Sequence, residues 1–282
     1  MREVITGDGR TLAVEEWGVE DGTPVVYAAG SPMSRLARYP DPALFTELGV
    51  RLITYDRPGV GRSDARPGRV VADAADDIEA IADHLGLGRF PLFGVSGGGP
   101  HALAFAAAHP TRVSRVATLA AIAPRDADGL DWTAGMMEGN VLSAKAALLG
   151  REAVEELLLA AGTAAPPQLP PVEAEVLARP EVREMIGAAF AEGVRPGVGG
   201  WVDDVMALFG KPWGFDPGMV MVPVLLWHGG VDSTVPVTHA HWLAERMPGA
   251  DVRIDPTAGH AGHFDATPEI LRWLLRREDQ GN

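Results

Sequence analysis

The chain has 282 residues, is 46% hydrophobic, carries a formal net charge of −14 and contains no cysteine. Without cysteine there are no disulfides, thiolate nucleophiles or cysteine-bound metals, and the negative charge disfavours nucleic acid and anionic membrane as partners because it repels phosphate. No apolar stretch reaches the roughly 20 residues of a membrane span and the first residues lack a signal-peptide core, so we expect a globular, cytoplasmic protein with one domain plus an insertion.

The first part of the chain alternates short β-rich runs with helical patterns. Residues 4–5 and 12–17 flank Gly7-Asp8-Gly9-Arg10 and predict an opening hairpin, because Asp-Gly is a strong turn signal. The alanine-rich run 98–109 stops before Pro110, as a buried helix does. Between these segments we predict strands at 24–30, 50–56 and 90–95 and helices at 42–48 and 73–85.

The same alternation returns near the end of the chain. Residues 113–123 read as a strand, and strand, helix, strand and helix then follow at 222–228, 238–247, 252–255 and 268–277. Strands alternating with helices need crossover connections. We therefore predict an α/β fold with a mostly parallel, doubly wound sheet that is covered by helices on both faces.

The alternation lapses between residues 124 and 222, which we interpret as a helical cap, or lid, inserted into a core made of 1–123 and 223–282. Helical patterns occur at 144–160, 172–178, 182–192 and 200–209, and they are interrupted by Pro166-Pro167, Pro170-Pro171, Pro196 and Pro212. Aromatic and thioether side chains of this segment are candidates to line an apolar substrate pocket, although packing against the core is the commoner role for any one of them. These candidates are Trp132, Met136, Trp201, Met206 and Trp213.

Ser96 lies where the predicted strand 90–95 ends and the next helix begins, within Gly94-Val95-Ser96-Gly97-Gly98. This is the spacing of a nucleophile elbow, in which glycines are required because the sharp turn brings backbone segments very close together. With 34 glycines in the chain the spacing alone is not specific. A serine nucleophile also needs a base and an acid to orient that base.

Two later strand ends carry residues of those types. Asp232 follows the strand 222–228, and His260 follows the strand 252–255. An imidazole removes the serine proton, and a carboxylate fixes the imidazole tautomer and stabilises its charged form. The chain order Ser96, Asp232, His260 therefore predicts a catalytic triad.

Alternatives to the acid and the base are present. His263 is a rival base, and His260 is favoured because it is nearer to the strand end. Asp126 is a second acid candidate, while Asp232 has the alternative role of capping the next helix. No cluster has metal-ligand spacing, and the pair His239 and His241 is expected on the surface, since residues two apart do not share a helix face.

Several motifs together resemble the α/β-hydrolase superfamily, in its serine-nucleophile, lid-bearing form. The elbow around Ser96 matches, and residues 56–63 (Asp-Arg-Pro-Gly-Val-Gly-Arg-Ser) resemble the family's Asp-Arg-Pro-Gly-x-Gly-x-Ser loop. His228-Gly229-x-x-Asp232 and Gly259-His260 resemble its acid and base segments. The similarity extends from the first strands to the last helix, and the cap is the part that matches weakly.

The resemblance implies an oxyanion hole formed by the backbone N–H groups of Gly97 and Ser31. Ala29 stands where the family usually has a histidine that braces this loop. Ser34 and Arg35 are possible substitutes for the histidine, but we expect them at the solvated surface. Serine at the elbow disfavours the chemistry of haloalkane dehalogenases and epoxide hydrolases, which carry aspartate there.

These observations predict a serine hydrolase that needs no cofactor or metal. It would cleave a small, partly apolar ester, thioester or lactone through an acyl-enzyme on Ser96. Two alternatives remain: a C–C bond hydrolase or cofactor-free lyase that relies on His260 and the oxyanion hole, and a non-catalytic ligand-binding protein. The expected partner is a small-molecule substrate, and the sequence does not fix the oligomeric state.

Overall fold

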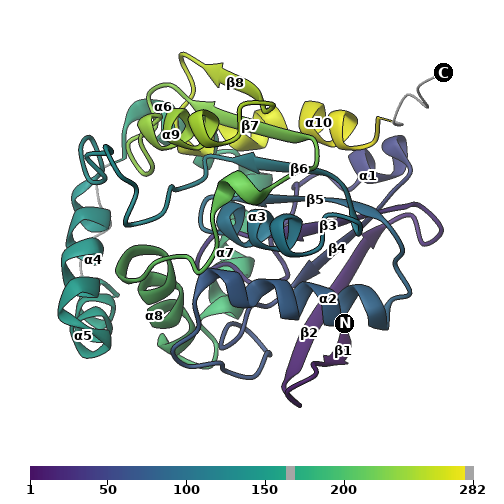
Figure 1. Cartoon of the computed structure of the whole chain (residues 1–282), viewed down its shortest axis with the longest axis horizontal. Helices are drawn as coiled ribbons and strands as arrows, with labels where there is room; N and C mark the ends of the chain where they lie inside the picture. Colours follow the sequence, from purple (N-terminus) through teal and green to yellow (C-terminus); the bar gives the residue numbers. More distant parts are fainter. Residues whose placement is uncertain (163–168, 277–282) are drawn as a thin grey trace.

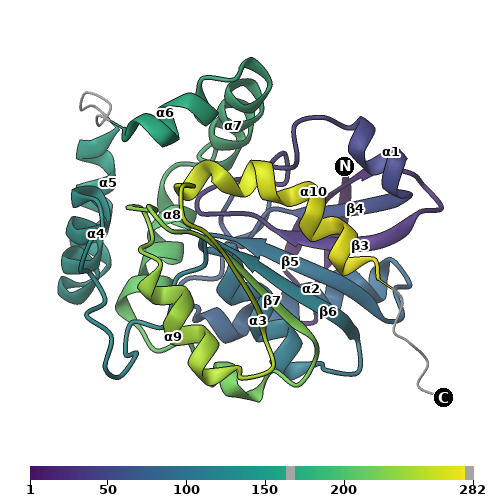
Figure 2. The ribbon, with the colours of Figure 1, turned by 90° about the horizontal axis from the view of Figure 1, so that it is seen from above.

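Eight strands form one sheet between two layers of helices (Figures 1 and 2). The computed structural model describes residues 1–162 and 169–276. The strand order is β1-β2-β4-β3-β5-β6-β7-β8, with β1 and β2 antiparallel to their neighbours and the others parallel. The strands are β1 (Arg2–Ile5), β2 (Thr11–Gly18), β3 (Thr23–Ala28), β4 (Val50–Tyr55), β5 (Phe90–Val95), β6 (Val113–Leu119), β7 (Val224–Gly229) and β8 (Asp251–Asp255).

The predicted α/β class with a mostly parallel sheet is confirmed. In-register apolar side chains cross the central strands and explain why the sheet is buried on both faces. One such row consists of Ile53, Val26, Leu92, Val116 and Val224, all of which belong to the same buried core. Continuous apolar strands of this kind are typical of a parallel sheet covered by helices.

Helices pack on the two faces of this sheet. The helices α2 (Ala74–His84), α3 (Gly98–Ala108) and α9 (Thr238–Arg246) contribute to the core on one face, and α1 (Ala43–Leu48) and α10 (His263–Leu274) contribute to the core on the other. Helix α3 follows Ser96 and is almost completely buried, with small alanine side chains that allow it to approach the sheet closely. The serine is thereby fixed between a central strand and a central helix.

The segment from 124 to 222, called the cap below, contains α4 (Glu138–Leu149), α5 (Arg151–Ala161), α6 (Pro171–Leu177), α7 (Pro180–Gly193), α8 (Gly199–Val205) and a π-helical turn (Met206–Gly210). Both figures show these helices grouped at one end of the sheet. The helix predicted over 144–160 is divided, because Gly150, with φ 114°, separates α4 from α5. The predicted break at Pro166-Pro167, and the last residue of the helix predicted over 268–277, lie outside the described residues.

Close backbone contacts attach the cap to the core. Ser34 N–H donates to Ala189 O (3.1 Å) and Gly61 N–H donates to Gly193 O (3.0 Å), so α7 is hydrogen-bonded to two core loops. At the start of α8, Gly200 faces Gly59 so closely that a side chain at Gly200 would overlap the Gly59 carbonyl. In the described parts of the chain no helix has the length and apolar content to cross a membrane.

Candidate active site

Ser96 occupies a strained turn between β5 and α3. Its φ of 54° lies in the left-handed region that residues with side chains rarely adopt. A Cβ atom at Gly94 would overlap the Gly98 carbonyl, and one at Gly98 would overlap the Ala28 carbonyl. Both glycines are therefore needed sterically, as the sequence spacing predicts. Ser96 N–H donates to Leu119 O (2.8 Å), which fixes the turn to β6.

Asp232 and His260 meet at the ends of β7 and β8. His260 Nδ1 lies 2.8 Å from Asp232 Oδ2. The other carboxylate oxygen, Oδ1, accepts the backbone N–H groups of Thr234 (2.8 Å) and Val235 (2.9 Å), which orients the carboxylate toward the imidazole. When Nδ1–H donates to Asp232, His260 Nε2 is left unprotonated and able to accept a proton.

The electrostatics of this pair favour a charged imidazole. Burial alone would lower the pKa of His260, but the charge and hydrogen bond of Asp232, assisted by Glu173, raise it above its ordinary value. Burial would conversely raise the pKa of Asp232, yet His260 and His228 hold it well below its usual range. The aspartate therefore stays ionised and stabilises the imidazolium that proton transfer would create.

The alternative candidates, His263 for the base and Asp126 for the acid, occupy different environments. His263 lines the same cavity as Ser96, with its ring centroid 6.3 Å from that of His260. Burial, followed by the charge of His260, lowers the pKa of His263 to about 3, so this ring stays neutral. Asp126 is exposed and lines a separate depression with Trp213 and Trp242. The structure thus places Asp232, and not Asp126, against His260.

The loop of residues 29–32 carries the candidate oxyanion donor Ser31, is called the oxyanion loop below, and is positioned by an arginine. Arg57 donates to the carbonyl oxygens of Ala29 and Gly30, the latter at 3.2 Å. Ser31 N lies close to Gly97, since a Cβ atom added to Gly97 would be 3.6 Å from Ser31 N. Arg57 comes from the Asp-Arg-Pro-Gly loop and braces residues 29 and 30 through these two hydrogen bonds.

A buried aspartate of the cap holds that arginine. Asp204 of α8 accepts the Ser31 hydroxyl (2.6 Å) and pairs with both Arg57 (2.6 Å) and Arg69 (2.5 Å). Its side chain is fully buried. Burial would raise its pKa, but the two arginines outweigh this effect and hold the pKa far below its usual range. Asp204 of the cap therefore contacts the oxyanion loop directly, at the Ser31 hydroxyl, and indirectly, through Arg57.

The expectation that Ser34 and Arg35 are surface residues is wrong. Both are buried, because α7 packs over them. Arg35 pairs with Asp56 (2.7 Å) of the loop after β4 and with Glu192 (2.8 Å) of the cap. Arg35 therefore joins the cap to the core, while Arg57 braces the oxyanion loop.

A second cap carboxylate holds the base loop, residues 256–262. Glu173 of α6 is buried, and its two oxygens accept the backbone N–H groups of His260 and Ala261, the latter at 2.7 Å. Its carboxylate lies so close that any side chain at Gly259 would overlap it. Neither Glu173 nor Asp204 is among the functional residues that the sequence predicts. The one available signal for Asp204 is the pair Asp203-Asp204 in the otherwise apolar α8, and it does not tell the two residues apart.

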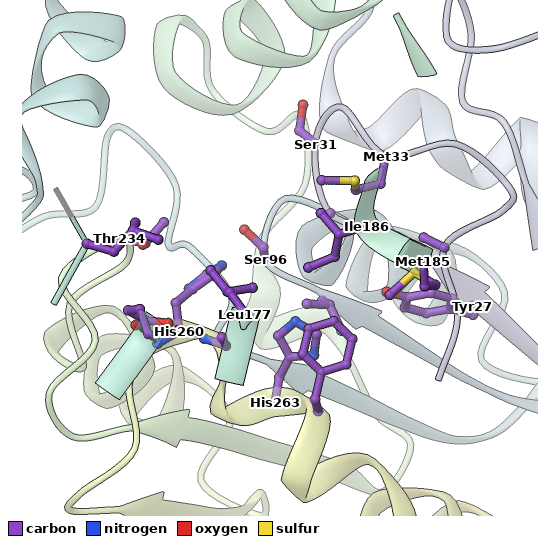
Figure 3. A pocket seen from close by; sticks show the side chains of 17 residues that line it. Tyr27, Ser31, Met33, Ser96, Leu177, Met185, Ile186, Thr234, His260 and His263 are labelled. Atoms are coloured by element: carbon purple, nitrogen blue, oxygen red, sulfur yellow. Dashed lines mark hydrogen bonds between the residues drawn. The ribbon is translucent and has the colours of Figure 1, made fainter. Parts of the chain in front are cut away.

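Two cavities meet at Ser96, Ser31 and Thr234. Figure 3 shows the larger one, with Ser96 between Ser31 on one side and His260 on the other. We call it the base-side cavity; it has a volume of about 260 Å³, and its wall includes Tyr27, Met33, Leu177, Met185, Ile186, His260, His263 and Phe264. The oxyanion-side cavity measures about 130 Å³ and is lined by Gly97, Ile122, Asn140, Ser143, Trp201, Val205, Leu208, Phe209 and Val235.

Of the five pocket candidates from the sequence, the structure brings one to these cavities. Trp201 lines the oxyanion-side cavity. Trp132, Met136 and Trp213 are instead buried in the main core, where Trp132 Nε1 donates to Ala123 O (2.9 Å). Met206 packs with the core between α5 and α8. The loop after β6 folds back onto the core, so its large side chains face inward.

The expected surface position of His239 is also wrong. His239 is buried, and its ring accepts the Ala123 N–H at Nδ1 (3.0 Å) and contacts the Trp132 carbonyl at Nε2 (3.0 Å). Burial lowers its pKa to about 4. His241 is exposed, as expected. The described residues contain no group of side chains that could hold a metal ion.

Comparison with known proteins places this geometry in context. The family model of the alpha/beta hydrolase fold matches residues 23–267. A non-heme chloroperoxidase from Streptomyces lividans is 35% identical over 126 residues, which cover 44% of this chain and 46% of that protein. A bifunctional esterase/perhydrolase from Acinetobacter calcoaceticus is 29% identical, with the same two coverages. The chain thus spans about half the length of these curated relatives.

Solved structures give the same picture for the fold. An esterase from Exiguobacterium antarcticum superimposes with a TM-score of 0.72 at 23% identity, and the match covers 97% of each chain. At this level of identity the likeness concerns the fold alone.

Proposed function

Because the chain belongs to the alpha/beta hydrolase fold family, we propose that it is a serine hydrolase acting on a small, uncharged, partly apolar ester, thioester or lactone. The observation that carries the proposal is the strained Ser96, which shares a cavity with His260 while His260 is bound to the buried Asp232. An esterase/perhydrolase among the relatives agrees with it.

In the first half of the reaction Ser96 Oγ attacks the carbonyl carbon, and His260 Nε2 takes the hydroxyl proton. Asp232 stabilises the resulting imidazolium through Nδ1. The N–H groups of Gly97 and Ser31 donate to the negative oxygen of the tetrahedral intermediate. The intermediate collapses when the bond to the leaving oxygen or sulfur breaks, and the imidazolium gives its proton to that atom.

In the second half water attacks the acyl-enzyme. His260 Nε2 takes one proton from the water as its oxygen bonds to the acyl carbon, and the same N–H groups hold the oxyanion. The bond to Ser96 Oγ then breaks, and the imidazolium returns its proton to Oγ. The products are a carboxylic acid and the free serine, so the cycle needs only substrate and water.

The walls of the two cavities favour an uncharged substrate. Among the described residues that line them, none is lysine or arginine. Glu173 is the only carboxylate there, and both its oxygens already accept backbone N–H groups. A substrate carboxylate would therefore be buried without a lysine or arginine partner, which is costly.

The test is Ser96→Ala, with Ser114→Ala as the matched control, since Ser114 lies in β6 outside both cavities. We expect Ser96→Ala to lose hydrolysis of p-nitrophenyl esters and labelling by a fluorophosphonate probe while its circular dichroism stays that of the wild type. Ser114→Ala should retain both properties. Labelling that persists in Ser96→Ala, or a wild-type protein that is neither labelled nor active, would contradict the proposal.

A further inference from the structure

The two cavities at Ser96 share three residues but differ in the catalytic groups that they contain. His260 lines the base-side cavity only, whereas Gly97 lines the oxyanion-side cavity only. Besides the carbonyl oxygen, an ester bound at Ser96 has two substituents on its reacting carbon, the leaving alcohol and the acyl chain. The positions of His260 and Gly97 determine which cavity receives each substituent.

The leaving group belongs on the base side. His260 must give its proton to the leaving oxygen, and general acid catalysis requires that atom within hydrogen-bond reach of the imidazole. Only the base-side cavity has His260 in its wall among the described residues. The acyl chain must point away from His260, and the second cavity that reaches Ser96, on the oxyanion side, does not have His260 in its wall.

The volumes of the two cavities then limit the size of the acyl chain and of the alcohol. A water-sized group occupies about 30 Å³. The oxyanion-side cavity, at about 130 Å³, holds roughly four such groups, and the base-side cavity, at about 260 Å³, holds roughly nine. An acetyl to butyryl chain fits the smaller cavity, and a six-carbon chain or an aromatic ring fits the larger one.

The walls differ in adaptability as well as in volume. On the oxyanion side, Phe209 is packed edge-on against the buried Trp132, with 5.1 Å between ring centroids, and Asn140 Nδ2 donates to Thr234 O (2.7 Å). On the base side the wall contains Met33 and Met185, whose unbranched side chains adapt to different shapes. The smaller cavity should therefore limit the size of the group that it binds more sharply than the larger cavity does.

We infer, on the basis of the serine hydrolase activity proposed above, that the preferred substrates join a short acyl group of about two to four carbons to a larger, apolar, uncharged alcohol. The acyl chain binds between α4, α8 and the π-helical turn. The alcohol binds beneath α6 and α7.

Two isomeric esters test this directly. Hexyl acetate and ethyl hexanoate have the same atoms and similar carbonyl reactivity, and they differ in which side carries the long chain. We expect kcat/KM, measured by titrating the released acid, to be at least tenfold higher for hexyl acetate, since each methylene that a pocket cannot accommodate costs about tenfold or more. Equal values, or a preference for ethyl hexanoate, would overturn the assignment.

Variants on the two sides should move the preference in a defined way. Phe209→Ala enlarges the oxyanion-side cavity and should raise the ethyl hexanoate to hexyl acetate ratio at least tenfold. Leu177→Trp narrows the base-side cavity and should also raise this ratio, by slowing hexyl acetate. Leu148→Ala, on the exposed face of α4, is the control and should leave the ratio of the two kcat/KM values unchanged. A ratio that does not respond to either cavity variant contradicts the assignment.

Fluorophosphonate labelling separates the two proposals. If the wild-type protein is neither labelled at Ser96 nor active on any ester, the proposed function itself fails. If it is labelled but hydrolyses neither isomer, or prefers ethyl hexanoate, the nucleophile stands and the division of the substrate fails.

Discussion

The two halves of the cap, α6–α7 and α8 with its π-helical turn, hold the base loop and the oxyanion loop by different physical means. Helix α6 places Glu173 on the base loop, where its carboxylate accepts two neutral backbone N–H groups. Helix α8 places Asp204 against the oxyanion loop, where it forms buried ion pairs with Arg57 and Arg69. A cap that carries such contacts is part of the active-site framework as well as its cover.

The difference predicts unequal rigidity. Removing one partner of a buried ion pair leaves an uncompensated charge and costs about 3–5 kcal/mol, whereas an unsatisfied neutral donor costs about 1–3 kcal/mol. The Asp204 ion pairs lie beside the smaller cavity, which Trp201 and Val205 of the same helix line, and the Glu173 contacts lie beside the larger, methionine-containing one. Substitutions in the oxyanion half should therefore destabilise the protein more than substitutions in the base half.

The largest effect is expected from Asp204→Asn. Because Arg57 and Arg69 would remain buried without a full counter-charge, the free energy of unfolding should fall by about 3–5 kcal/mol, as measured by urea denaturation. The kcat should fall as well, since the Ser31 and Arg57 contacts orient the oxyanion loop.

Asp203→Asn is the matched control on the same helix. Asp203 is itself buried, but its partner Arg151 has a side chain that is 43% exposed, so water can solvate that arginine when the carboxylate charge is lost. The loss should stay near 1 kcal/mol or below. Equal losses in the two variants would contradict the distinct role of Asp204.

A smaller effect is expected from Glu173→Gln. The glutamine amide can accept only one of the two N–H groups, so kcat should fall about tenfold, which corresponds to about 1.4 kcal/mol. The Glu173 charge helps to raise the pKa of His260, and the base must be neutral to act. Wild-type kcat/KM therefore declines as the pH falls through that pKa, and the variant's decline should move to lower pH.

Glu175→Gln, at an exposed position of the same helix, provides the control for this shift. It should leave both kcat and the acid limb of the pH profile as in the wild type. An acid limb that stays in place in Glu173→Gln would show that this residue supports the loop only sterically.

The smallest effect is expected from His263→Gln. Burial and the nearby His260 charge lower the pKa of His263 to about 3, so this ring does not change protonation in the neutral range. We expect less than a tenfold loss of kcat/KM on p-nitrophenyl acetate. A loss of the 10²–10⁴-fold typical of a missing general base would make His263 the base in place of His260.

The sequence predicts the local features of this molecule well. Ser96 lies at the end of a β-rich run, with Gly94 and Gly98 at positions where the backbone leaves no room for a side chain. The alternation of strands and helices predicts the parallel sheet, because each crossover is encoded within a few tens of residues. Asp232 and His260 follow their strands in the same local way.

The missed residues depend on distant partners. Ser31 and Asp204 are 173 positions apart, and Glu173 contacts a backbone group 87 positions away. A carboxylate in a short helix has no local pattern that distinguishes a buried anchor from a solvated residue. Trp132 and Met136 are pocket candidates because they are large apolar side chains of the cap, whereas the path of the loop after β6 buries them in the core.

Trapping the acyl-enzyme tests the central claim most directly. The protein is mixed with p-nitrophenyl acetate, quenched in acid within milliseconds to seconds, digested and analysed by mass spectrometry. The account predicts an acetyl group on the peptide containing Ser96, with none on that peptide in Ser96→Ala. Turnover without any adduct on Ser96, or with an adduct on another residue, would contradict it.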